Sequence, residues 1–235
     1  VDRELTSSFE CVVRVGHRPR EAADEGNVRE TGVDERGRVV DAVDRLAPEN
    51  TWVIYTSDHG DMMTAHRLSG KGPAMYEEIT RIPFIVRPPD RARAGRSVPA
   101  PVSHLDLLPT MLDAAGLEIP PFLQGRSLVA EIAGDEPDPE PASGGAFIEF
   151  MRFAVNHDSW GGFQPIRCVV RGPLKLVVNL LDTDELYDLD ADPAENTNLI
   201  DREDYAERRD DLHDLLIDRM NETRDPMRGP AWERR

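Results

Sequence analysis

Lysine, cysteine and long apolar runs are scarce in this chain of 235 residues. No stretch approaches the roughly 18 to 20 uncharged apolar residues that a membrane-spanning helix needs, so we expect no membrane partner. The two cysteines, Cys11 and Cys168, have neither the spacing of a metal site nor the number of a disulfide framework. Lysine occurs only at Lys71 and Lys175 among 28 basic residues, so each lysine calls for a specific reason.

The charge is strongly acidic, with 45 Asp and Glu residues and a formal net charge of −17. A broad basic surface is therefore absent, and we expect no nucleic-acid partner, because phosphates would be repelled. Abundant acid with almost no lysine is typical of halophilic proteins from high-salt cytoplasms, where salt screens the self-repulsion. The alternative is a GC-rich genome that encodes Arg in place of Lys.

The compartment follows from weaker signals. The segment Val1–Glu10 has no basic-then-apolar run, so no signal peptide is visible. Cys168 lies in an apolar run that predicts a buried free thiol. Together these features favour a cytoplasmic location. The chain also begins without an initiator Met, which is compatible with the removal of a leader or of a whole domain.

The segment 31–134 has the pattern of an α/β fold. An amphipathic helix over 34–47 precedes the β-rich, apolar segment Thr51–Thr56, which predicts a strand buried on both faces, as in a parallel sheet. Ile82–Arg87 predicts a second strand. A helix over 103–115 has Ser103 as its cap and Gly116 as its stop, and Pro109 predicts a break or a late start.

The segments outside 31–134 have different sequence patterns. Residues 1–30 are irregular, and 135–145 is rich in Pro, Gly and acid, which indicates a linker. Residues 146–235 predict a small α+β subdomain with an antiparallel sheet and one helix. Its expected elements are strands over 146–151, 166–171 and 174–180, an edge strand over 185–189, and a helix over 203–220.

The loop after the first predicted strand concentrates candidate site residues. In open α/β sheets ligands bind beyond the carboxyl ends of strands. There, Asp58 and His59 offer an oxygen and a nitrogen for a divalent metal, and Gly60 permits a sharp bend. Lys71 offers an ammonium for a sulfate or phosphate oxygen, and His66 is a candidate substrate contact.

Each candidate also has a plain structural interpretation. Asp58 can cap a turn, His59 and Lys71 can be ordinary surface residues, and His66 can hydrogen-bond within its loop. His104, on the predicted helix, is more often structural. An acidic group around a later turn is more typical of a solvated face than of a metal cluster; it comprises Asp188, Asp190 and Asp192.

A run of ordered motifs resembles the second half of the sulfatase family in the alkaline phosphatase superfamily. The resemblance covers about Val33 to Met220 and is carried by Ser57–His66, Lys71–Gly72, Met75–Glu78, Arg81–Val86, Ser103–Gly116, Gly125–Leu128 and Glu185–Leu199. It implies an alkaline phosphatase-like sheet with flanking helices, present in part. Two positions depart from the family pattern: Thr64, where Gly is usual, and Arg67.

The resemblance implies roles residue by residue. Asp58 and His59 match metal ligands, with calcium favoured and manganese or magnesium as alternatives. Lys71 matches the lysine that contacts the sulfate and the leaving oxygen, and His66 matches a histidine near the substrate. The family nucleophile, a Cys oxidised to formylglycine in a C-x-P-S-R motif, has no counterpart, because Cys11 lacks the following Pro.

The resemblance therefore implies a hydrolase of sulfate esters, present as a C-terminal fragment that needs a complementing N-terminal half. Its expected substrate is a sulfated small molecule or carbohydrate. Phe153–Gly162 either reaches toward the substrate or packs as a surface loop. One alternative is a phosphonate monoester or phosphodiester hydrolase of the same superfamily. The other is a non-catalytic remnant.

Overall fold

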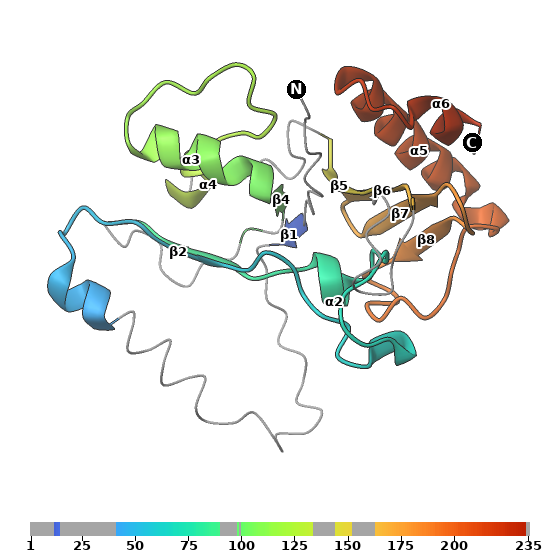
Figure 1. Cartoon of the computed structure of the whole chain (residues 1–235), viewed down its shortest axis with the longest axis horizontal. Coiled ribbons are helices and arrows are strands. Elements are labelled where there is room, and N and C mark those ends of the chain that lie inside the picture. The colour runs from blue at the N-terminus through green and yellow to red at the C-terminus, as the bar shows by residue number, and fades with distance from the viewer. Residues whose placement is uncertain are drawn as a thin grey trace.

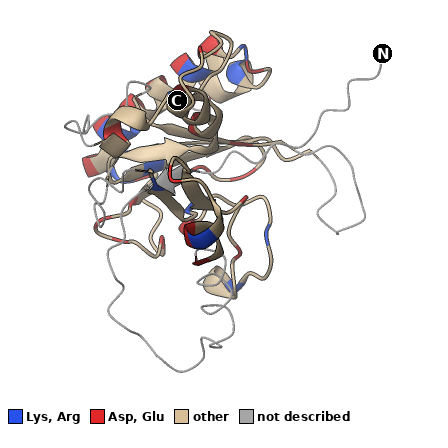
Figure 2. Cartoon of the chain, turned by 90° about the vertical axis from the view of Figure 1, so that its left-hand side faces the viewer, with Lys and Arg blue, Asp and Glu red and all other residues tan. Residues whose placement is uncertain are grey.

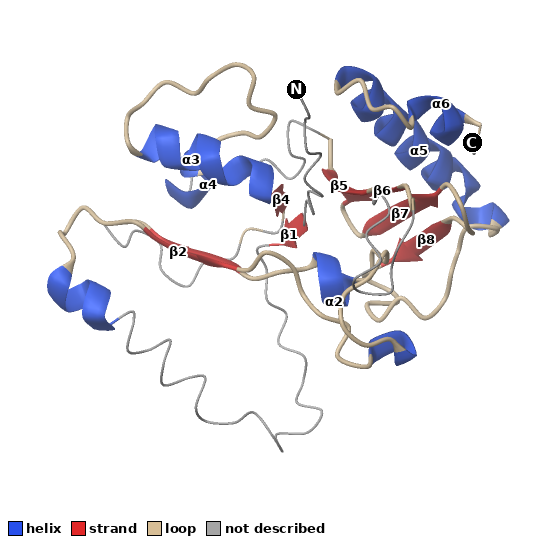
Figure 3. Cartoon of the chain, in the orientation of Figure 1, coloured by secondary structure: helices blue, strands red, loops and turns tan. Residues whose placement is uncertain are grey.

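The described part of the molecule contains three antiparallel sheets (Figure 1). The structure is a computed structural model that describes residues 12–14, 41–89, 98, 100–133, 144–151 and 163–233. Figure 3 shows a site-bearing half, residues 41–133, beside a C-terminal half, residues 144–233, in which helices cover a sheet.

In the site-bearing half, β2 (Val53–Thr56) pairs with β3 (Phe84–Arg87) and follows a helical segment, 41–46. The expectation of a parallel strand buried on both faces is wrong, because β2 runs antiparallel to β3. The cross-strand partners Tyr55 and Ile85 are 41 % and 61 % exposed. Within the described chain β2 has one strand partner, β3.

The second segment of this half begins at β4 (Pro101–Ser103), which pairs with β1 (Val12–Arg14), a strand inside a region expected to be irregular. A 3₁₀ turn, His104–Asp106, leads into α3 (Leu107–Ala114), and α4 (Val129–Ala133) follows.

The start and end of α3 confirm the capping signals in the sequence. Ser103 and Asp106 cap each other's backbone N–H groups at the 3₁₀ turn. The expected late start is confirmed, because Pro109 is the third residue of α3, where a missing N–H costs no helical hydrogen bond. Gly116 ends the segment at φ 68°.

The C-terminal half is a meander of four antiparallel strands. Its strand predictions are confirmed, with β5 at Ala146–Phe150, β6 at Ile166–Arg171, β7 at Leu174–Asn179 and β8 at Glu185–Asp188. The predicted helix is a 3₁₀ turn, Glu203–Tyr205, followed by α5 (Ala206–Glu222). A second helix, α6 (Arg228–Trp232), was not expected from the sequence.

Both faces of this sheet are covered. Helix α5 packs on one face through Leu212, Leu216 and Met220. The opposite face packs against Met75 and Tyr76, which precede α2 (Glu77–Thr80) in the site-bearing half. The sheet thus lies between its own helices and the segment that leads into α2. Cys168 lies within it as a fully buried free thiol, as expected, and burial raises its pKa to about 12.

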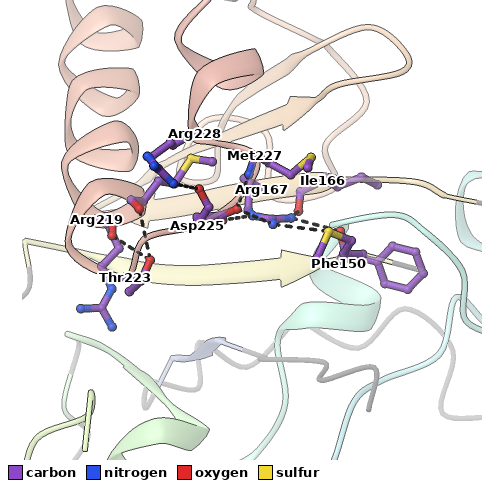
Figure 4. Close-up of polar contacts among 10 residues, drawn as sticks. Phe150, Ile166, Arg167, Arg219, Thr223, Asp225, Met227 and Arg228 are labelled. Atoms are coloured by element: carbon purple, nitrogen blue, oxygen red, sulfur yellow. Dashed lines mark hydrogen bonds and ion pairs between the residues drawn. The ribbon is translucent and has the colours of Figure 1, made fainter. Parts of the chain in front are cut away.

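One buried ion pair fastens the C-terminal half internally (Figure 4). The Arg167 guanidinium donates to both carboxylate oxygens of Asp225, and to the carbonyl oxygens of Ile166 and Phe150. Both side chains are at most 2 % exposed. The pair therefore joins β6 to the turn after α5 without contacting the other half.

The remaining sequence expectations have mixed outcomes. The acidic residues around 188–192 form turns: Asp188 accepts from the N–H groups of Asp190 and Ala191, and Asp192 accepts from Thr197. The linker 135–145, apart from Gly144 and Gly145, and the segment 153–162 lie outside the described residues. Acidic and basic residues both occur along the C-terminal helices (Figure 2). No helix among the described residues is long and apolar enough to span a membrane.

Candidate functional site

Three of the four predicted site residues lie together just beyond the carboxyl end of β2. The Nε2 atom of His59 is 2.7 Å from the Nζ atom of Lys71 and 3.3 Å from Oδ2 of Asp58. Two of these residues are adjacent in sequence, but Lys71 comes from twelve residues further along the same loop. The loop thus folds back and gathers a carboxylate, an imidazole and an ammonium at one point.

The hydrogen bonds of His59 define its tautomer. Its Nδ1 lies 2.8 Å from the carbonyl oxygen of Gly60, which can only accept, so Nδ1 carries the proton. The Nε2 lone pair then accepts from the ammonium of Lys71. A neutral imidazole with a free Nε2 lone pair is the form of histidine that binds a metal.

Asp58 completes the pair as an anion. Its side chain is 82 % exposed, and the pKa of its carboxyl is lowered, chiefly by the hydrogen bond from the backbone N–H of His59. The carboxylate is therefore ionised at neutral pH. A hard oxygen beside an imidazole nitrogen is a donor set suited to a divalent cation.

The fit to a metal is that of a partial site. Asp58 and His59 supply two donors, and among the described residues no group of three or more His, Cys, Asp or Glu side chains converges on one point. The Lys71 ammonium also occupies the lone pair that a cation needs. A cation bound by His59 therefore requires Lys71 to turn away from Nε2.

Backbone contacts hold the loop in place. The Ser57 hydroxyl donates to the carbonyl of His59, and Nε2 of His104 donates to the carbonyl of Ser57 at 2.7 Å. His104 thus has the structural role that the sequence favoured. Gly60 has a reason other than a sharp bend: a Cβ there would lie 1.9 Å from the carbonyl oxygen of Glu78 in α2.

His66 lies apart from this cluster. Its ring stacks on Tyr76, with 3.8 Å between centroids and 9° between planes. No hydrogen bond among the described contacts joins it to Asp58, His59 or Lys71. It lies in a left-handed stretch where Thr64, the departure noted above, has φ 75° and His66 itself has φ 50°.

A second polar cluster, Lys175 with Glu77 and Glu195, was not predicted from the sequence. Lys175 is fully buried, and its ammonium contacts Glu77 Oε1 at 2.7 Å, Glu195 Oε1 at 2.8 Å and the carbonyl of Met75 at 2.8 Å. Burial alone would lower the pKa of Lys175, but the charges of Glu77 and Glu195 outweigh burial and raise it. The available signal was a lone lysine inside an apolar strand.

Comparisons with known proteins identify the family. Residues 66–222 match the family model described as the C-terminal part of N-sulphoglucosamine sulphohydrolase. The chain is 50 % identical over 202 residues to a protein named uncharacterized sulfatase YidJ from Escherichia coli K12. That alignment covers 86 % of this chain but 38 % of the relative, so the chain spans well under half the length of its relative.

Two solved structures show the same fold. One, solved with its substrate D-glucosamine-2-N,6-O-disulfate, is 29 % identical with a TM-score of 0.69, and the match covers 83 % of this chain and 40 % of that one. The other is a phosphonate monoester hydrolase of Agrobacterium radiobacter, 29 % identical with a TM-score of 0.67, covering 80 % and 39 %. The alkaline phosphatase-like fold expected from the resemblance is thus confirmed for the part of the chain that aligns.

Proposed function

Because the chain belongs to the sulfatase family, we propose that it supplies the metal-binding and leaving-group part of a site that hydrolyses sulfate esters. The observation that supports this most directly is the convergence of Asp58, His59 and Lys71 at the end of β2. An anionic oxygen, a neutral nitrogen and a mobile ammonium serve two tasks there. The first two bind a cation, and the third neutralises an oxyanion.

The roles follow from the chemistry of each group. Asp58 and His59 hold a divalent ion, with calcium favoured and manganese or magnesium as alternatives; when bound, the ion polarises the sulfate oxygens. Lys71 exchanges its hydrogen bond to His59 for one to the sulfate and the leaving oxygen, where it offsets the developing negative charge. His66, fixed in orientation by Tyr76, contacts an oxygen of the substrate.

The nucleophile belongs to a complementing N-terminal half in this proposal. The chain aligns with 38 % of the length of a full relative. Asp58 and His59 supply two ligands, and a divalent cation needs more. We assign the further ligands and a formylglycine to the N-terminal half. The substrate class we propose is a sulfated carbohydrate, supported by the disulfated glucosamine in the similar solved structure.

The test is turnover of an aryl sulfate by the chain combined with the N-terminal half of a relative. Lys71→Ala should lower kcat about 100- to 1,000-fold, the usual effect of losing one preorganised charge contact. Asp58→Ala should abolish metal-dependent activity. Arg67→Gln is the matched control, because it removes an exposed cation from the same loop without touching the cluster.

The outcomes separate the parts of the proposal. Wild-type turnover by Lys71→Ala would contradict the role of Lys71, and turnover by the chain alone would contradict the need for a second half.

A phosphonate monoester hydrolase is the second candidate, favoured by the similar solved structure. Preference for an aryl phosphonate ester over an aryl sulfate would identify it. Absence of turnover on both substrates in the combined protein would favour a non-catalytic remnant.

We also propose that the chain is adapted to high salt. The net charge of −17 implies self-repulsion that salt screens, so the urea midpoint of unfolding should rise from low to molar salt. A midpoint that stays flat over this range would contradict the proposal. The cytoplasmic location stays a prediction.

A further inference from the structure

The Lys175 cluster connects the two halves of the molecule. Lys175 lies on β7, Glu77 is the first residue of α2, and Glu195 follows β8. All three ammonium protons of Lys175 have an acceptor: Glu77, Glu195 and the Met75 carbonyl. The second oxygen of Glu195 accepts from the backbone N–H of Glu77 at 2.6 Å. The start of α2 is thus fixed by both its side chain and its backbone.

Helix α2 in turn carries the site loop. The backbone N–H of Gly60 donates to the carbonyl of Ile79 at 2.8 Å, at the far end of this one-turn helix. Gly60 lies against the Glu78 carbonyl with no room for a side chain. Any shift of α2 must therefore move Gly60 and, with it, the adjacent Asp58–His59 pair.

The same cluster also fixes the second arm of the site. The ammonium of Lys175 donates to the carbonyl of Met75, four residues after Lys71, and Met75 is buried against the sheet. The ammonium of Lys175 is thus linked to residues 58–60 through α2, and to Lys71 through the four residues that end at Met75. Among the described residues, the hydrogen bonds of Arg167 and Asp225, the other buried pair, all lie within the C-terminal half.

We propose that Lys175, Glu77 and Glu195 form a positioning strut that sets the place of the Asp58–His59 pair and of Lys71 from the C-terminal sheet. The residues act through α2 and do not touch the reacting groups. The inference deepens the proposed function, since it names what aligns the site. Its structural content does not depend on which reaction the site performs.

The test compares two neighbouring glutamates on α2. Glu77→Ala removes one of the strut's two carboxylates and leaves the Lys175–Glu195 ion pair balanced, so we expect the fold to be retained. Glu78→Ala makes the same change of charge in the same helical turn, but outside the strut. Amide hydrogen exchange of the 235-residue chain then reports the Gly60 N–H, with amides of β6 and β7 as the internal reference.

Glu77→Ala should lower the protection of the Gly60 amide by about tenfold or more, since the charge-assisted contact between α2 and Lys175 is lost, while β6 and β7 keep their protection. Glu78→Ala should leave Gly60 at the wild-type value. Equal effects of both variants, or no effect of Glu77→Ala, would overturn the strut. So would a parallel loss at all amides, which would indicate a purely structural role.

A second variant approaches the strut from the other side. Lys175→Met/Glu195→Gln neutralises two members of the strut and removes the ammonium that contacts the Glu77 carboxylate. Gly60 should again lose protection, although the substitutions are 115 and 135 residues away in sequence. Arg167→Met/Asp225→Asn is its matched control and should leave Gly60 unchanged. Loss at Gly60 in both double variants, or in neither, would contradict the strut.

A kinetic measurement separates this inference from the proposed function. In the combined enzyme Glu77→Ala should lower kcat on an aryl sulfate more than it raises KM, and Glu78→Ala should change neither. Exchange effects at Gly60 without any turnover in the wild-type protein would leave the strut standing and contradict the proposed function. If the wild-type enzyme turns over the substrate, and Glu77→Ala changes neither the Gly60 exchange nor kcat, the proposed function stands and the strut is contradicted.

Discussion

The site-bearing half and the C-terminal half differ in how they are held together. The first has a buried cluster of four apolar residues between β3, β4 and the start of α4: Ile82, Phe84, Val102 and Leu128. The second buries two larger clusters, one on each face of its sheet, and an internal ion pair. The half with the candidate chemistry is thus the less consolidated one, and it contacts the other half through Met75, Tyr76 and Glu77.

This contrast has a physical basis. A charged cluster must stay accessible to a ligand, so the residues around it cannot be covered by core side chains. The alternative source of order is a rigid neighbour, and the β5–β8 sheet is one. The Lys175–Met75 contact crosses the boundary between the halves, and the Gly60–Ile79 hydrogen bond joins α2 to the site loop.

The largest effect is expected inside the C-terminal half. Arg167→Met leaves the Asp225 carboxylate buried without its partner, which should destabilise the protein by about 3–5 kcal/mol. The measurement is the free energy of unfolding in urea. Arg202→Met is the control, because its ion pair with Asp204 is exposed and should contribute nothing measurable. Similar losses for both variants would contradict the special status of the buried pair.

The next effect is expected at the boundary between the site loop and α2. A methyl group at Gly60 meets the Glu78 carbonyl at 1.9 Å, a distance that no side-chain rotation can relieve. Gly60→Ala should therefore cost about 1–3 kcal/mol or more and displace the Asp58–His59 pair. The His59 side-chain ¹⁵N shifts report this displacement. Gly229→Ala, where no atom lies within 4 Å, is the matched control.

The same contrast governs what the sequence predicts. Strands β5 to β8 and helix α5 follow from apolar periodicity, because each packs against partners within the described chain. The segment Thr51–Thr56 misleads, because its apolar run suits a strand covered on both faces, whereas here Tyr55 faces outward. An apolar run shows which residue types a strand contains. How many faces of the strand are covered depends on neighbouring segments, which the run does not identify.

Predictability at the site divides in a similar way. The Asp58–His59 pair and Lys71 are visible as polar residues in a loop after a strand, and lysine is rare in the chain. The strut cannot be seen in the sequence. Glu195 lies 20 residues after Lys175, but Glu77 lies about 100 residues before it, and only the fold brings the three side chains together. The glycine at position 60 can be read from the sequence. The reason that a glycine is needed there, the close approach of α2, appears only in the folded structure.

The smallest effect is expected in the left-handed stretch of the site loop. Thr64 has φ 75° and ψ −1°, a conformation that costs a β-branched residue roughly 1–2 kcal/mol. Thr64→Gly removes that cost but adds backbone entropy to the unfolded chain, so the net gain in stability should be about 0.5–1 kcal/mol.

The opposite substitution provides the control for Thr64. Gly116, which ends α3 at φ 68° with open space around it, should lose about 1 kcal/mol when changed to Ala, since only its backbone conformation is at stake. Urea midpoints of the two variants should therefore move in opposite directions. A loss of stability in Thr64→Gly would mean that contacts of the Thr64 side chain outweigh the strain of its backbone, and that the loop is held by more than α2.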